Sequence, residues 1–200
     1  MPKLQLGHAL VFRSSSFWDG LNSRKQTFQD TGIPKLELGN EEPSMTIADV
    51  IVRFQGMDIS AAEKFLHEQI PITRAMGLRV VTNDESGFTV EAPVALNLNH
   101  LRTAFGGSIN AVATLAAYGL LWMELNDAAA HVVVAESSIR FLRPVRETIR
   151  ATCLRPDATS LATFRDQFAE KRNARITLRV NVIEAGEIAA EFEGRFVARR

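Results

Sequence analysis

The stretch that decides the fold is Asn97–Asp127, NLNHLRTAFGGSINAVATLAAYGLLWMELND. It reads as a polar loop, a Gly-Gly pair and one long helix, and Ser108–Met123 contains no Asp, Glu, Lys or Arg. A helix that is apolar on nearly every side is either enclosed by protein or spans a membrane. The run is interrupted by Asn110, Thr114 and Tyr118 and is shorter than the roughly 20 apolar residues that a span needs. We therefore expect a helix enclosed by the rest of the fold.

Composition limits the class of protein. The 200 residues fit one domain with extensions. Lys plus Arg and Asp plus Glu are 23 each, so no net field favours a nucleic acid or a membrane as partner. The single cysteine, Cys153, excludes an internal disulfide and a cysteine-built zinc site, which fits the cytoplasm. The start, MPKLQLGHALVF, is a poor signal peptide because Gln, Gly and His break its apolar run.

The N-terminal part divides into an extension and the start of a domain. Residues 1–44 mix turn formers, charges and isolated aromatics without a clean period, so we expect a loosely ordered extension. An alternative is that the protein begins at Met45 or Met57. Residues 45–200 are expected to form the domain, with an apolar stripe typical of a helix over Met45–Gln55.

A second helix and a sheet flank the central helix. Ser60 followed by Glu63 predicts a capping box at the start of a helix over Ala61–Gln69. A short amphipathic helix is predicted through Leu161, Phe164 and Phe168. The predicted strands are Leu78–Thr82, Phe88–Pro93, His131–Pro144, Glu147–Leu154, Ile176–Glu184 and Glu187–Ala198.

The long strand His131–Pro144 shows a two-residue period. The odd-numbered residues from Val133 to Phe141 are expected on one face and the even-numbered ones on the other. Strands segregated from one dominant helix indicate an α+β fold with an antiparallel sheet. A helix that is hydrophobic on all sides needs that sheet to curl around it.

This order of elements, with NLNHLRTAFGGS at Asn97–Ser108, resembles the hotdog-fold thioesterases, in particular the YiiD C-terminal-type branch. The resemblance covers about Ile70–Arg199 and is also carried by ITRAMGLRVV, SSIRFLRPV and AAEFEGRFVA. It implies a curved antiparallel sheet wrapped around one long central helix. It also implies subunits paired edge to edge, with active sites between them, as a homodimer or a tetramer of dimers.

Many thioesterases of this superfamily carry the pattern N-x-x-x-T-x-H-G-G, which the chain matches in part. By resemblance, Asn99 stands at the position of their active-site Asn. Thr103, Gly106 and Gly107 match the Thr and the Gly pair, Phe105 replaces the His, and Thr114 falls where those enzymes usually carry an Asp or Glu. The last two departures leave the mechanism open.

Chemistry at the helix start suggests roles for three of these residues. The first amides of a helix have no internal partner, and the dipole adds positive potential, so the Gly107 amide could polarise a thioester carbonyl. Thr114 lies two turns further on the same face and, with Asn99, could hold the attacking water. Alternatively, the Thr114 hydroxyl bonds to its own helix carbonyl. The predicted substrate-binding residues are Thr103, Phe105, Gly106, Ser108, Asn110 and Arg143.

The general base is not obvious from the sequence. Glu136 interrupts an apolar strand and is a candidate, or it simply faces outward. Glu124 near the helix end is expected to be solvated, and His100 beside Asn99 is a candidate or an exposed loop residue. His67 and His131 have no companion at metal-ligand spacing, so no metal is predicted.

Arg140, Arg143 and Arg146 cluster around Pro144. They would suit the phosphates of coenzyme A or an acidic carrier protein, although exposed arginines at strand ends are common.

The expected function is hydrolysis of an acyl thioester of coenzyme A or acyl carrier protein, in fatty acid metabolism, with no added cofactor. Neither a nucleic acid nor a membrane is expected as partner. Two alternatives remain: decarboxylation of a malonyl thioester at the same site, and binding of an acyl thioester without catalysis.

Overall fold

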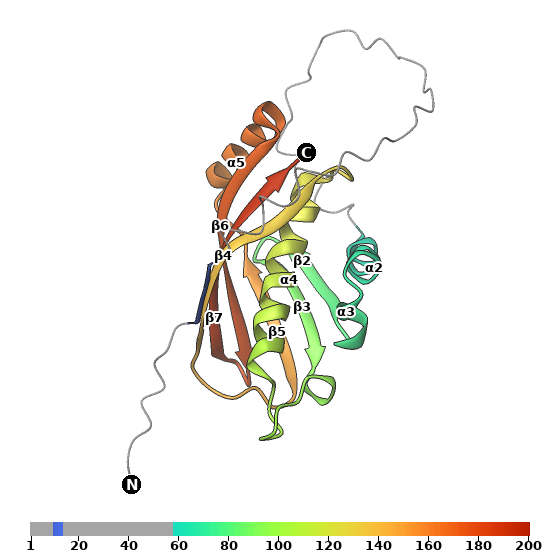
Figure 1. Cartoon of the computed structure of the whole chain (residues 1–200), viewed down its shortest axis with the longest axis vertical. Coiled ribbons are helices and arrows are strands. Elements are labelled where there is room, and N and C mark those ends of the chain that lie inside the picture. The colour runs from blue at the N-terminus through green and yellow to red at the C-terminus, as the bar shows by residue number, and fades with distance from the viewer. Residues whose placement is uncertain (1–9, 14–57) are drawn as a thin grey trace. The chain divides into compact units, whose positions relative to one another are not determined.

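The computed structural model describes residues 10–13 and 58–200 of the chain. Seven strands in these residues form one antiparallel sheet, in the order β1-β4-β7-β6-β5-β3-β2 (Figure 1). The strands are β1 (Leu10–Arg13), β2 (Arg79–Asp84), β3 (Gly87–Pro93), β4 (His131–Phe141), β5 (Thr148–Leu154), β6 (Asn173–Glu184) and β7 (Glu187–Arg199). The helices are α2 (Ile59–Gln69), α3 (Ile72–Ala75), η2 (Val94–Leu96), α4 (Gly106–Leu125) and α5 (Ala158–Lys171).

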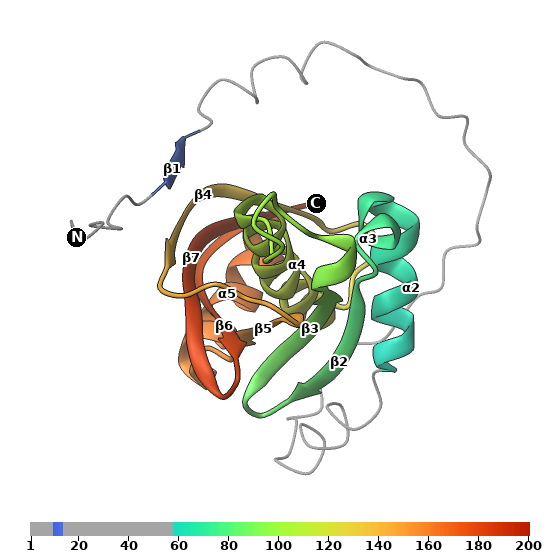
Figure 2. The same cartoon turned by 90° about the horizontal axis from the view of Figure 1, so that it is seen from below.

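The long central helix is α4, and the sheet curves around it (Figure 2). It packs against β3, β4, β5, β6 and β7. Ten of its 20 residues are buried, including Leu120 and Leu121. By length and composition α4 could cross a bilayer, but the core helix of a soluble protein meets the same test and most of this one is buried in the fold. The predicted α+β fold with an enclosed central helix is confirmed.

Close approach of the sheet to α4 depends on Gly119. A Cβ atom at this position would lie 2.4 Å from the Phe88 ring, which is fully buried on β3. The predicted strands are all present, with ends shifted by a few residues. The β6–β7 hairpin turns at Ala185 and Gly186, with φ of 50° and 80°, as the favoured two-residue turn requires.

The predicted capping box at α2 is wrong. Asp58 is the N-cap, and its carboxylate accepts a hydrogen bond from the Ser60 amide at 2.8 Å. Glu63 instead reaches the sheet, where it accepts a hydrogen bond from the Val80 amide at 2.8 Å. Glu63 therefore binds a backbone amide of the edge strand β2 and does not cap its own helix.

The predicted faces of β4 are interrupted by a β-bulge between Val134 and Glu136. Because a bulge inserts one extra residue, side chains before and after it exchange faces. Val132 and Ile139 are therefore both buried although they are an odd number of residues apart. A strict two-residue period could not show this.

Two predictions for the N-terminal part fall largely outside the described residues. The helical stripe over Met45–Gln55 lies entirely outside them, and of the extension over residues 1–44 only Leu10–Arg13 is described. These four residues form β1, which pairs antiparallel with Glu136–Ile139 of β4. Part of the predicted extension therefore belongs to the sheet.

Candidate functional site

The loop before α4 is held by a buried asparagine that the sequence analysis did not single out. Asn97 is 4% exposed, and its amide nitrogen donates to the carbonyl oxygens of Met76 and Pro93, both at 2.9 Å. The Phe105 amide donates to the Asn97 carbonyl at 2.7 Å, which closes the loop onto itself. The sequence shows only that this Asn precedes eight loop residues and a Gly pair. A polar residue in a loop is usually exposed, so the sequence does not predict that Asn97 is buried.

The carboxamide of Asn99 is used within the same loop. Its oxygen accepts from the amides of Leu101 and Thr103 at 2.8 and 3.1 Å. Its nitrogen donates to the Thr103 hydroxyl at 2.9 Å and to the Ala104 carbonyl at 3.3 Å. Asn99 and Thr103 therefore contact each other within the loop, and both hydrogens of the Asn99 carboxamide are already engaged.

The start of α4 offers free backbone donors. Phe105 is the N-cap residue, and no side chain of the described residues caps the helix or places an acid in its first turn. The first amides of a 20-residue helix therefore point outward under the positive end of its dipole. Gly106 lies against the Phe141 ring and Gly107 against the half-exposed Phe105 ring.

A single stripe of α4 is left incompletely covered by the sheet. Asn110, Thr114, Tyr118 and Trp122 follow one another at a spacing of four residues, and all are half-buried. Phe65 of α2 stacks on the far end of this stripe, with ring centroids 4.4 Å from Trp122 and 6.3 Å from Tyr118. The near end lies beside Gly107, against which the Phe105 ring packs.

The hydroxyl of Thr114 donates to the Asn110 carbonyl at 2.9 Å. This is the intrahelical bond that the sequence left open as an alternative. Because the only hydroxyl hydrogen is used, the oxygen can still accept a hydrogen bond but cannot donate one. Thr114 is therefore suited to orient a water through one of the water's own hydrogens.

The connection from β4 to β5 lies beside the helix start. The Ala104 amide donates to the Val145 carbonyl at 2.8 Å, so the arginines around Pro144 are carried to this end of the molecule. Arg143 pairs with Glu187 at 3.5 Å, and Arg140 pairs with Glu191. Both pairs are solvent-exposed, so a bound anion could compete for these guanidinium groups.

The two carboxylates considered as bases are both held in ion pairs. Glu136 pairs with Arg195 at 3.0 Å on the exposed sheet surface, which fits the outward-facing interpretation. Glu124 is not solvated as predicted: its side chain is 4% exposed and pairs with Arg155 and with Arg165, the latter at 3.3 Å. Arg155, which follows β5, and Arg165 of α5 offset the unfavourable interaction of the Glu124 charge with the C-terminal end of the helix dipole. His100 is exposed in the loop next to Asn99.

Neither a reactive cysteine nor a metal site is found among the described residues. Cys153 is fully buried on β5, and burial raises the pKa of its thiol to about 12, so it stays protonated. In the part of the chain that the structure describes, no three His, Cys, Asp or Glu side chains are grouped to hold a metal ion.

Large apolar side chains are exposed around the helix start. Leu101 is 69% exposed, and the others are Leu96, Leu98, Phe105 and Leu142. They come from η2, from the loop between η2 and α4, and from the residue that follows β4. A group of exposed apolar side chains at one end of a protein indicates a surface that binds an apolar ligand or another protein.

Residues 59–200 match the family model described as "Putative thioesterase (yiiD_Cterm)". A solved structure of a protein of unknown function from Chlorobaculum tepidum is 28% identical, with a TM-score of 0.68 over 78% of this chain and 98% of that one. A "putative thioesterase" from Shewanella oneidensis is 27% identical, with a TM-score of 0.61 over 71% and 97%. A Pseudomonas aeruginosa protein described as a "Probable Thioesterase", 24% identical with a TM-score of 0.63 over 72% of this chain and 96% of that one, shares the fold. The predicted hotdog fold is confirmed.

Proposed function

The chain belongs to the family described as "Putative thioesterase (yiiD_Cterm)", and from this membership we propose that it hydrolyses the acyl thioester of coenzyme A or of acyl carrier protein. The observation that supports the proposal most directly is the glycine start of α4, which no described side chain caps, one turn before Asn110 and two turns before Thr114. A carbonyl oxygen directed at the Gly107 amide accepts a backbone hydrogen bond and interacts favourably with the positive end of the helix dipole. Both strengthen as the oxyanion develops in the transition state.

The attacking water is placed by Thr114. The Cα atoms of Gly107 and Thr114 are about 10 Å apart along the helix axis. The hydrogen bond to the Asn110 carbonyl turns the Thr114 hydroxyl back toward the helix start, so the hydroxyl lies closer to the Gly107 amide than the two Cα atoms lie to each other. One water that donates to the Thr114 oxygen can then attack the thioester carbon, giving a carboxylic acid and a free thiol.

In this proposal Asn99 acts chiefly by shaping the loop. Its four hydrogen bonds keep Thr103 and Ala104 in place before the helix start. Contact with the water or the carbonyl would require exchange of one of these bonds. His100, exposed next to Asn99, is the candidate base that takes the proton from the water.

A homodimer fits the exposed surface of this end. The apolar side chains around Leu101 and Phe105 would be covered by a second copy or by the acyl chain. Edge-to-edge pairing through β4 requires β1 to leave Glu136–Ile139 or to be exchanged between copies, because it occupies that edge. Sedimentation of the full chain over a range of concentrations tests the dimer.

Decarboxylation of a malonyl thioester is the second candidate. In the described residues both carboxylates that were considered as bases are tied to arginines, and decarboxylation needs a polarised carbonyl but no attacking base. Hydrolysis releases a thiol, whereas decarboxylation releases carbon dioxide and leaves the thioester intact. A panel of saturated acyl and malonyl thioesters, with thiol and carbon dioxide both measured, separates the two. Saturable binding without either product would indicate a binding protein.

A further inference from the structure

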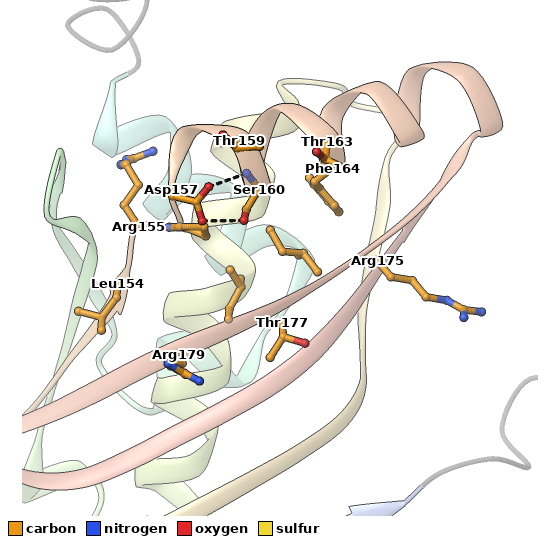
Figure 3. Close-up of a pocket in the computed structure, with 13 residues that line it drawn as sticks. Leu154, Arg155, Asp157, Thr159, Ser160, Thr163, Phe164, Arg175, Thr177 and Arg179 are labelled. Atoms are coloured by element: carbon orange, nitrogen blue, oxygen red, sulfur yellow. Dashed lines mark hydrogen bonds between the residues drawn. The ribbon is translucent and has the colours of Figure 1, made fainter.

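A cavity of about 650 Å³ lies between α5 and β6 (Figure 3). This volume falls within the range of roughly 300–1,000 Å³ that is typical of ligand sites. One lining residue, Arg155, pairs with Glu124 in the last turn of α4. The cavity is therefore near the opposite end of a helix about 30 Å long from Gly107, and it is separate from the thioester site.

One wall of this cavity is an open strand edge. β5 pairs with β6 only between Arg150–Cys153 and Val180–Ile183. Residues 173–179 of β6 pair with β7 on their other side, and no described strand lies on the β5 side. Every second residue of this segment therefore presents its N–H and C=O to the cavity. An edge of this kind is a template for another extended chain.

The opposite wall is made by the chain that turns away from β6. Pro156 follows the end of β5 and has no amide to continue the ladder. Asp157 then caps α5, accepting hydrogen bonds from the Ser160 amide at 2.9 Å and the Ser160 hydroxyl at 2.7 Å. The hydrogen bonds from Ser160 lower the pKa of Asp157, so its charge stays at the helix start.

The two faces of the open edge differ in character. Arg175, Thr177 and Arg179 share the exposed face by the two-residue period, and the two arginines are about 14 Å apart along the strand. Arg175 has no ion pair with any described residue, and Arg179 makes an exposed pair with Glu193 at 3.0 Å. The other face lies toward α5, where Phe164 and Leu178 line the cavity.

We propose that the open edge of β6 is a docking site for an extended acidic segment of a partner protein, which adds as a strand beside residues 173–179. Acidic residues at every second position of that segment share one face and meet Arg175 and Arg179. The residues between them face α5 and the apolar floor of the cavity. A small anion fits less well, because Arg175 points away from α5 and does not converge on the cavity (Figure 3).

The test uses the full chain and a fluorescein-labelled peptide of alternating Glu and Val, followed by fluorescence anisotropy. We expect saturable binding, and at least tenfold weaker binding by the double variant Arg175→Glu with Arg179→Glu. Arg79→Glu is the control for a general charge effect, because it reverses one exposed arginine at the start of β2, as each substitution of the double variant does on β6. It should leave the affinity within about twofold of wild type.

Two comparisons separate strand addition from simple charge attraction. The Glu–Val peptide carrying N-methyl groups at all internal amides should lose binding, since it cannot pair with a strand. Amide hydrogen exchange in residues 173–179 should slow when the unmodified peptide is bound. The proposal is overturned if wild type shows no saturable binding, if the Arg175/Arg179 variant binds as tightly as wild type, or if the methylated or an alternating Lys–Val peptide binds equally well.

Discussion

The ring of Phe105 lies over the Cα atom of Gly107, so closely that a Cβ atom at position 107 would be 2.3 Å from Cε1 of the ring. A side chain at 107 and the present position of the ring are therefore mutually exclusive. The ring is 55% exposed and covers the start of α4, whose Gly107 amide we propose to polarise the thioester carbonyl.

Gly107→Ala should lower kcat/KM at least tenfold while the melting temperature stays the same or rises. Alanine favours the helix by up to about 1 kcal/mol over glycine, but its methyl group drives the Phe105 ring across the approach to the amide. Steady-state thiol release and thermal unfolding measure the two effects. The double variant Gly107→Ala with Phe105→Ala is the control; if it is no more active than Gly107→Ala, displacement of the ring is not the cause.

Thr114→Val should lower turnover more than tenfold without unfolding the protein. Valine keeps the shape of threonine and removes the oxygen that would accept a hydrogen from the water. Thr114→Ser keeps that oxygen and should retain most of the activity. Equal rates for the valine variant and wild type would place the water elsewhere.

Asn99→Ala should also lower turnover more than tenfold, with a modest loss of stability. The variant loses four hydrogen bonds within one loop, including those to Thr103 and Ala104. Each is worth about 1 kcal/mol at most in this half-exposed setting. Circular dichroism and a substrate titration would show a folded protein with reduced kcat; an unchanged rate would mean that the loop geometry is irrelevant to catalysis.

Glu124→Ala should destabilise the protein by about 3–5 kcal/mol, because it leaves Arg155 charged and nearly buried without its carboxylate. Urea unfolding measures the loss. The matched control is Glu191→Ala, which breaks an exposed pair with Arg140 and should change stability by no more than about 1 kcal/mol. Similar losses in both variants would contradict a special role for the buried pair.

Cys153 gives a prediction about pH. Its pKa is raised to about 12 in the folded protein from an ordinary value of 9.0, so unfolding releases a proton between these values. The contribution of the neutral thiol is fully present below pH 9 and is lost as pH rises toward 12, by about 1.4 kcal/mol per pH unit. The stability difference between wild type and Cys153→Ala should shrink accordingly above pH 9. A thiol reagent at pH 8 should label Cys153 only after denaturant is added.

Removal of residues 1–44 should leave a cooperatively folded protein with a melting temperature within about 4 °C of the full chain. The truncation removes only β1 from the described sheet, where it pairs with four residues of β4. Calorimetry and sedimentation of both forms measure stability and association. Collapse of the truncated form would show that the segment is integral to the fold, and tighter dimerisation would show that β1 blocks the β4 edge.

The class of fold could be predicted from the sequence because one feature dominated it. The uncharged run in α4 required enclosure, and the strands around it carried β-branched residues and turn signals that are local in the chain. The N-x-x-x-T spacing also placed Asn99 and Thr103 in one loop, as the structure shows. Each of these predictions depends only on residues that are close together in the sequence.

Other features required the tertiary structure. The local sequence predicts that Glu63 caps its own helix and that Glu124 is solvated, but Glu63 bonds to Val80 and Glu124 pairs with Arg155. Neither contact could be predicted, because both partners are distant in sequence. The bulge in β4, the burial of Asn97 and the ring of Phe105 over Gly107 are also decided by packing across elements. Local pattern thus determined which elements form, since hydrophobic period and turn chemistry act between near neighbours. Only the tertiary structure determined which polar groups pair with each other. Burial of an unpaired charge or amide costs so much free energy that buried polar groups pair with partners from distant parts of the sequence.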